Sequence, residues 1–113
     1  MRTIISGGRD YRFSYSDISY LDDLMGWLPI TEVVSGTARG ADKAGEAWAR
    51  SRGLPVKQFP ADWERHGRKA GPLRNLDMAD YADALVAFPG GDGTKDMVKT
   101  ARHRRLDIFD CRF

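Results

Sequence analysis

Residues 84–94 constrain the fold of this chain more than any other stretch, because an apolar run ends there in a glycine-rich turn. Residues 84–88 are all apolar without polar alternation, which is typical of a strand covered on both faces, as in the middle of a parallel sheet. The turn allows positive φ and close backbone approach, so its N–H groups can converge on an anion. It consists of Pro89, Gly90, Gly91, Asp92, Gly93 and Thr94. We expect Thr94 to cap a following helix, whose dipole favours an anion at the same point.

This stretch alone leaves two interpretations open: a phosphate-binding loop, or a strand-to-helix turn that holds no ligand. The rest of the chain supplies its context. Residues 3–6 are apolar at their centre and are expected to form the first strand, and 30–34 are expected to form the next strand. By contrast, 56–59 and 106–109 alternate polar and apolar residues, which fits edge strands. Between these segments, apolar residues recur at the spacing of amphipathic helices.

The alternation of strands and helices predicts an α/β fold, a three-layer sandwich with a five-stranded parallel sheet and right-handed crossovers. Taking the two continuously apolar strands as central neighbours gives the order 3-2-1-4-5. This order reverses direction between strands 1 and 4, and ligands bind at such a switch point, outside the carboxyl ends of the strands. Three glycine-containing turns are expected to meet there, which favours the phosphate-binding interpretation.

The predicted ligand-binding residues belong to these turns and to one nearby helix. They are Gly7, Gly8 and Arg9 of the first turn, Ser35, Gly36 and Arg39 of the second, the six residues 89–94, and Arg74. Arg74 is expected near the start of a helix, where it could clamp a phosphate through two N–H groups. The alternative for Arg74 is a surface ion pair. The first turn lacks the G-x-G-x-x-G pattern of dinucleotide-binding proteins.

Residues 60–70 form the longest segment without clear periodicity, and we expect an irregular loop there. Such a loop either folds over a ligand or is merely solvated. Trp63 within it could stack on a base or ribose, or could anchor the loop to the core. The helix that follows begins near Pro72, and the residues it is expected to bury are Leu73, Leu76, Ala79 and Tyr81.

Composition favours one domain spanning residues 1–113, since 42% hydrophobic residues suffice for a single core. The formal net charge of +2 argues against tight binding to duplex nucleic acid. One cysteine excludes an internal disulfide and fits a cytoplasmic protein, and no apolar run is long enough to span a membrane. Two histidines and one cysteine at unrelated spacings predict no metal site, and we expect no cofactor.

Four blocks of the sequence together resemble the YspA-type, cpYpsA-related branch of the SLOG superfamily. They are residues 7–10, 35–42, 70–75 and 88–94, and the resemblance covers nearly the whole chain. It implies a Rossmann-like fold related to the cytokinin-activating phosphoribohydrolases and to the DNA-processing protein DprA. It also implies a nucleotide or nucleotide-derived ligand and a homodimer.

The resemblance assigns roles to individual residues. The phosphoribohydrolase loop that holds a nucleotide phosphate is similar to residues 89–94, and the arginine of its upstream helix corresponds to Arg74. Its catalytic glutamate, three residues after the loop threonine, corresponds to Met97, and a thioether cannot replace a carboxylate in acid–base chemistry. The carboxylates that could act instead are Asp10, Asp42, Asp62 and Asp96, although the first three have ordinary roles in caps and turns.

These observations predict a protein that binds a nucleotide or nucleotide-derived phosphate compound, acting as a sensor. N-glycosidic hydrolysis of nucleoside monophosphates is the main alternative. A nucleic-acid-binding accessory role is a second and weaker one, suggested by basic residues such as Arg65, Arg68 and Lys69.

Overall fold

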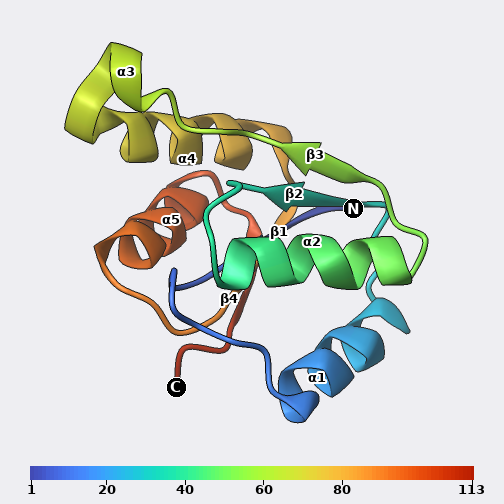
Figure 1. The fold of residues 1–113 in the computed structure, drawn as a ribbon. Coiled ribbons are helices and arrows are strands. Elements are labelled where there is room, and N and C mark those ends of the chain that lie inside the picture. Colours follow the sequence, from blue (N-terminus) through green and yellow to red (C-terminus); the bar gives the residue numbers. More distant parts are fainter.

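A computed structural model describes all residues, 1–113, and places five parallel strands in one sheet (Figure 1). In chain order the elements are β1 (Arg2–Ser6), α1 (Tyr15–Met25), β2 (Glu32–Ser35), α2 (Ala41–Ser51), β3 (Val56–Gln58), α3 (Trp63–His66), the 3₁₀ helix η1 (Gly67–Lys69), α4 (Ala70–Tyr81), β4 (Ala84–Ala87), α5 (Asp92–His103) and β5 (Asp107–Asp110). The strand order is β3-β2-β1-β4-β5. It confirms the α/β fold and the order predicted from the sequence.

The two continuously apolar strands are central neighbours, as predicted. β1 pairs with β4 in a register that sets Ile4 opposite Leu85 and Ile5 opposite Val86. All four residues of β4 and the last four of β1 are buried, whereas β3 at one edge exposes two of its three residues. A parallel strand with helices on both faces has no solvent-facing side, so its residues can be apolar without alternation.

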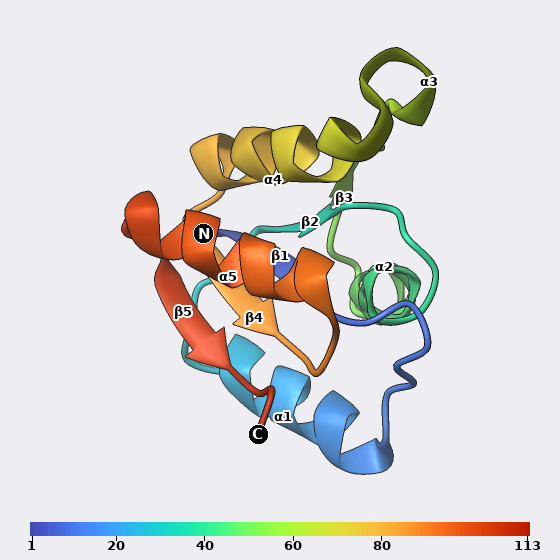
Figure 2. The same cartoon turned by 90° about the vertical axis from the view of Figure 1, so that its left-hand side faces the viewer.

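Two apolar clusters cover opposite faces of the sheet. On one face, Ile4 and Leu85 pack with α4 and α5 through Met78, Met97 and Ala101. On the other, the next residues along the same strands pack with α1 and α2 through Leu21, Leu24 and Trp48. Figure 2 shows the sheet between these helix layers. None of the helices has the length and apolar character needed to cross a lipid bilayer.

The segment predicted as an irregular loop is partly helical. Residues 63–66 form α3, and the 3₁₀ helix η1 connects it to α4. Asp62 caps α3, since its side chain accepts a hydrogen bond of 3.1 Å from the Arg65 amide. A single helical turn is too short to produce apolar periodicity, which is why the sequence pattern does not reveal it.

The buried face of α4 also differs from the prediction. Of the four residues predicted to be buried, Ala79 is buried and Tyr81 is partly buried, but Leu73 and Leu76 are exposed. Asn75 and Met78 are buried in their place. The helix begins at Ala70, two residues before Pro72, and its buried face includes the polar residue Asn75. The Asn75 side chain is hydrogen-bonded to the start of α5.

Candidate functional site

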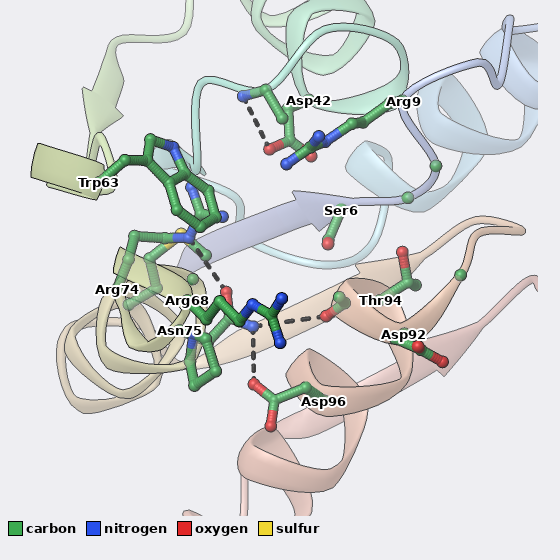
Figure 3. Close-up of a pocket in the computed structure, with 18 residues that line it drawn as sticks. Ser6, Arg9, Asp42, Trp63, Arg68, Arg74, Asn75, Asp92, Thr94 and Asp96 are labelled. Carbon is green, nitrogen blue, oxygen red and sulfur yellow. Dashed lines mark hydrogen bonds between the residues drawn. The ribbon is translucent and has the colours of Figure 1, made fainter. Parts of the chain in front are cut away.

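A pocket of about 640 Å³ lies at the carboxyl ends of β1 and β4, at the predicted switch point (Figure 3). Its volume is in the range typical of small-molecule sites. The lining comes from the turns after β1, β2 and β4, from the starts of α2 and α5, and from the segment α3–η1–α4. Charged side chains of both signs line it: Arg9, Arg68 and Arg74, and Asp42, Asp92 and Asp96.

The turns after β1 and β4 are packed directly against each other. The Gly8 amide donates a hydrogen bond of 2.8 Å to the Pro89 carbonyl. A Cβ on Gly8 would lie 3.1 Å from the Gly90 Cα, and a Cβ on Gly90 would lie 2.7 Å from the Gly8 nitrogen and clash with the Thr94 hydroxyl. Glycine is therefore required at positions 8 and 90 because the two turns lie so close together, and not because of the backbone conformation. The positive φ angles expected in this turn occur instead at Gly40, Gly53 and Gly67.

Helix α5 presents free backbone donors to the pocket. It begins at Asp92 with Gly91 as its N-cap, so Thr94 lies inside the first turn and is not the cap that we predicted. The first amide that donates within the helix is that of Lys95, to the Gly91 carbonyl (3.1 Å). The amides of Asp92, Gly93 and Thr94 have no protein acceptor, and all three residues line the pocket. Such a helix start favours an anion.

Arg74, on α4, lines the pocket and connects its helix to the segments that follow β2 and β3. Its guanidinium donates to the Gly36 and Phe59 carbonyls, and its Nε donates to the Asn75 side chain (3.1 Å). Burial lowers the pKa of Arg74, and the neighbouring Asp42 carboxylate acts in the opposite direction. The Nη2 group forms no hydrogen bond within the protein, so it remains available to a ligand.

Asp42, in the first turn of α2, is the buried carboxylate of the pocket. Its side chain accepts a hydrogen bond of 3.2 Å from the Ala38 amide. Burial raises the pKa of Asp42 to about 6, while the amides of Ala38 and Gly7 and the charge of Arg74 partly counteract this rise. A carboxyl group with such a pKa changes protonation near neutral pH.

Asn75 and Asp96 form a polar pair on the α4–α5 side (Figure 3). The Asn75 amide donates to the Asp96 carboxylate (2.9 Å) and to the Gly93 carbonyl (3.4 Å). Met97, which corresponds to the phosphoribohydrolase glutamate, is fully buried in the core against the sheet. Asp96, one helical position away, lines the pocket instead, as does Asp92 at the start of the same helix.

Trp63 and two arginines frame the mouth of the pocket. Trp63 is half exposed on α3, and the Arg9 guanidinium lies 5.9 Å from its ring centroid. Neither Arg9 nor Arg68 forms an ion pair. This part of the site therefore combines an accessible aromatic surface with unneutralised positive charge.

The structure brings together most of the residues predicted to bind a ligand. Those that line the pocket are Gly7, Gly8, Arg9, Arg74, Gly91, Asp92, Gly93 and Thr94. Pro89 and Gly90 instead hold the turn against Gly8. Gly36 and Arg39 line an adjoining hollow.

Ser35, by contrast, does not line the pocket. Its buried hydroxyl donates to the Glu46 carboxylate (2.6 Å) and accepts from the Thr37 amide (3.0 Å). Burial alone would raise the pKa of Glu46, but hydrogen bonds from Ser35 and Gln58 and nearby cations bring it below its ordinary value. Ser35 therefore belongs to an internal polar network that joins β2 and β3 to α2.

Other polar residues outside the predicted ligand-binding set also line the pocket, among them Arg68, Asn75 and Asp96, of which Asp96 was expected only as a possible catalytic carboxylate. Asn75 directly follows Arg74 in the sequence, and its buried position inside a helix is the signal that could have identified it, since a buried amide needs polar partners.

The sheet order and the glycine-lined pocket at its switch point define a Rossmann-like α/β protein with a site suited to a small ligand. The chain belongs to the YspA, cpYpsA-related SLOG family, whose model matches residues 1–66. It is also 36% identical over 118 residues to the Gene 61 protein of Mycobacterium phage D29, an alignment that covers 96% of this chain and 94% of the phage protein. No solved structure matches the chain.

Proposed function

We propose that this protein binds a nucleotide or nucleotide-derived phosphate compound in the pocket and acts as a sensor of it. The observation that carries the proposal is the group of free amides in the first turn of α5, which open into the same pocket as Arg9, Arg68 and Arg74. Backbone donors and guanidinium groups are the standard partners of phosphate oxygens. Membership of the SLOG family is consistent with a nucleotide-related role.

The distribution of polar groups suggests an orientation for the ligand. The phosphate would accept from the amides of residues 92–94 and from Arg74. The ribose hydroxyls would bond to the Asn75 and Asp96 side chains, which offer both donors and acceptors. The base would lie against Trp63 at the mouth, because an exposed aromatic ring provides a stacking surface.

Adenosine 5′-monophosphate (AMP) and other nucleoside monophosphates test this proposal by thermal shift and calorimetry. A ligand at 100 times its dissociation constant stabilises the folded state by roughly 2.7 kcal/mol. The proposal predicts such a shift for at least one nucleotide and none for the corresponding nucleoside, which lacks the phosphate. Equal shifts for nucleotide and nucleoside would show that the pocket does not recognise phosphate.

Arg74→Ala is expected to weaken nucleotide binding about tenfold, because it removes a charge-assisted hydrogen bond worth roughly 1.5 kcal/mol. Arg104→Ala is the matched control, since Arg104 pairs with Asp80 and lines no part of the pocket. Calorimetry on both variants, with circular dichroism to verify folding, measures the difference. Equal affinity of folded Arg74→Ala and Arg104→Ala would remove Arg74 from the site.

N-glycosidic hydrolysis is a second candidate function, and the raised pKa of Asp42 favours it. A carboxyl group with a pKa of about 6 can act as a general acid near neutral pH. However, the residue that corresponds to the catalytic glutamate of the phosphoribohydrolases is Met97, and its side chain is buried in the core. We therefore expect the protein to bind nucleotides without efficient turnover.

Chromatography of nucleoside monophosphates incubated with the protein separates the two functions. We expect free base to appear no faster than in buffer alone. Faster release by the unmodified protein that Asp42→Asn abolishes would establish hydrolysis, with Asp42 as its acid. Asp92→Asn, which changes an exposed carboxylate of the same pocket, controls for charge.

A further inference from the structure

A second hollow, of about 480 Å³, adjoins the main pocket. Arg9, Ala38, Trp63 and Arg74 line both cavities, so the two hollows meet at these residues. The second hollow extends between the turn after β2 and the segment that precedes α3. A ligand in the main pocket could therefore continue past Trp63 into this space.

The charges that line the two hollows differ. The main pocket has three carboxylates, whereas the only charged side chains around the second hollow are Arg9, Arg39 and Arg74. Arg9 has no ion-pair partner, and the Arg39 pair with Asp10, at 3.3 Å, is exposed on both sides. Exposed pairs of this kind are weak and exchange readily with other anions. The lining of the second hollow is thus positively charged, with no carboxylate of its own; the nearest ones are Asp10, beside Arg39, and Asp42 of the main pocket, beside Arg74.

The backbone at this hollow is held in an unusual conformation. Thr37 has a φ of 68°, which a β-branched residue rarely adopts. The Ser35 hydroxyl accepts from the Thr37 amide, and the Asp42 carboxylate accepts from the Ala38 amide, so internal hydrogen bonds fix the turn. Strained residues that the surrounding structure holds in place cluster at active sites, ligand-binding segments and switch regions. Arg39 follows directly on this fixed turn.

We propose that the second hollow binds a second phosphate group of the same ligand. The ligand class is then a nucleotide with two separate phosphate groups, such as a nucleoside bisphosphate or a short dinucleotide. This inference rests on the proposed function, because the main pocket holds the first phosphate. One phosphate contacts the start of α5, the other contacts Arg39 and Arg9, and Trp63 lies between them.

Calorimetry with three probes tests this inference: AMP, adenosine 3′,5′-bisphosphate and the 5′-phosphorylated dinucleotide pApA. At least one of the two-phosphate probes is expected to bind about tenfold more tightly than AMP. Arg39→Ala is expected to remove this gain and to leave AMP affinity within twofold. Arg12→Ala is the matched control, since Arg12 is an exposed arginine that lines neither hollow. All titrations use the same ionic strength.

The outcomes distinguish this inference from the proposed function. If AMP binds but neither two-phosphate probe gains affinity, the second subsite is wrong and the proposed function stands. The inference is also wrong if Arg39→Ala and Arg12→Ala reduce the affinity of the two-phosphate probes equally, because this would indicate a general charge effect. If neither AMP nor the other probes bind, the proposed function fails and the inference fails with it.

Discussion

Asp42→Asn is expected to raise the free energy of unfolding by about 3 kcal/mol at pH 7.5 and to change it little at pH 4. The pKa of Asp42 rises from 3.8 to about 6 on folding, so the folded state binds its proton more tightly than the unfolded state. The stabilisation from this proton is fully present below pH 3.8 and is lost as the pH rises through 6. A shift of this size corresponds to about 3 kcal/mol. Asparagine is never ionised, so it avoids this loss.

Urea unfolding of the parent and of Asp42→Asn at several pH values between 4 and 8 measures this effect. The stability difference is expected to grow between pH 4 and pH 6 and then to remain constant. Asp23→Asn is the control for the loss of one carboxylate, since the Asp23 side chain is exposed on α1. A difference that does not vary with pH would contradict the raised pKa. A gain in stability at neutral pH combined with weaker nucleotide binding would show that this carboxylate is kept for function.

Gly90→Ala is expected to lower the free energy of unfolding by roughly 3 kcal/mol, near the upper end of the usual range for overpacking. The added Cβ would lie 2.7 Å from the Gly8 nitrogen and 3.0 Å from the Gly8 Cα, and it would clash with the Thr94 hydroxyl. To relieve these contacts, the two turns must separate, which displaces the free amides of α5. Nucleotide affinity is therefore expected to fall as well.

Gly93→Ala is the matched control for stability, because a Cβ at Gly93 meets no atom within 4 Å. Gly93 also lies in the first turn of α5, where alanine favours the helix relative to glycine. Chemical denaturation and calorimetry with AMP compare the two variants. If both are as stable as the parent, the packing of one turn against the other does not constrain the site.

The sequence predicts the architecture well because the burial of a strand determines which of its residues are apolar. Strands covered on both faces must be apolar throughout, and the runs around Ile4 and Val86 show this pattern. Identifying them as central neighbours determines the sheet order, and the sheet order determines where the turns meet. The location of the site thus follows from two apolar strands and from the glycines after them.

Side-chain direction within the site was harder to predict, because it depends on helix phase. Correspondence with the phosphoribohydrolases suggested that position 97 faces the loop, but Met97, Val98 and Ala101 form the buried stripe of α5. Neighbouring positions differ by about 100° around a helix, so Asp96 faces the pocket instead. The apolar stripe of α5 predicts the direction of these side chains better than the correspondence does.

Ser35 shows a second reason why side-chain roles are hard to predict. Its partner Glu46 lies on another element, so the hydrogen bond between them depends on tertiary packing.

The pairing of β1 with β4 also determines when this chain can fold. β1 lies at the centre of the sheet, yet one of its two neighbours begins only at Ala84. Until that strand has been synthesised, the backbone N–H and C=O groups along one side of β1 have no partner, and unpaired strands of this kind associate with other chains. A fragment of residues 1–66, the part that the family model matches, contains three strands but leaves this edge open. We therefore expect it to aggregate rather than to form a smaller folded protein.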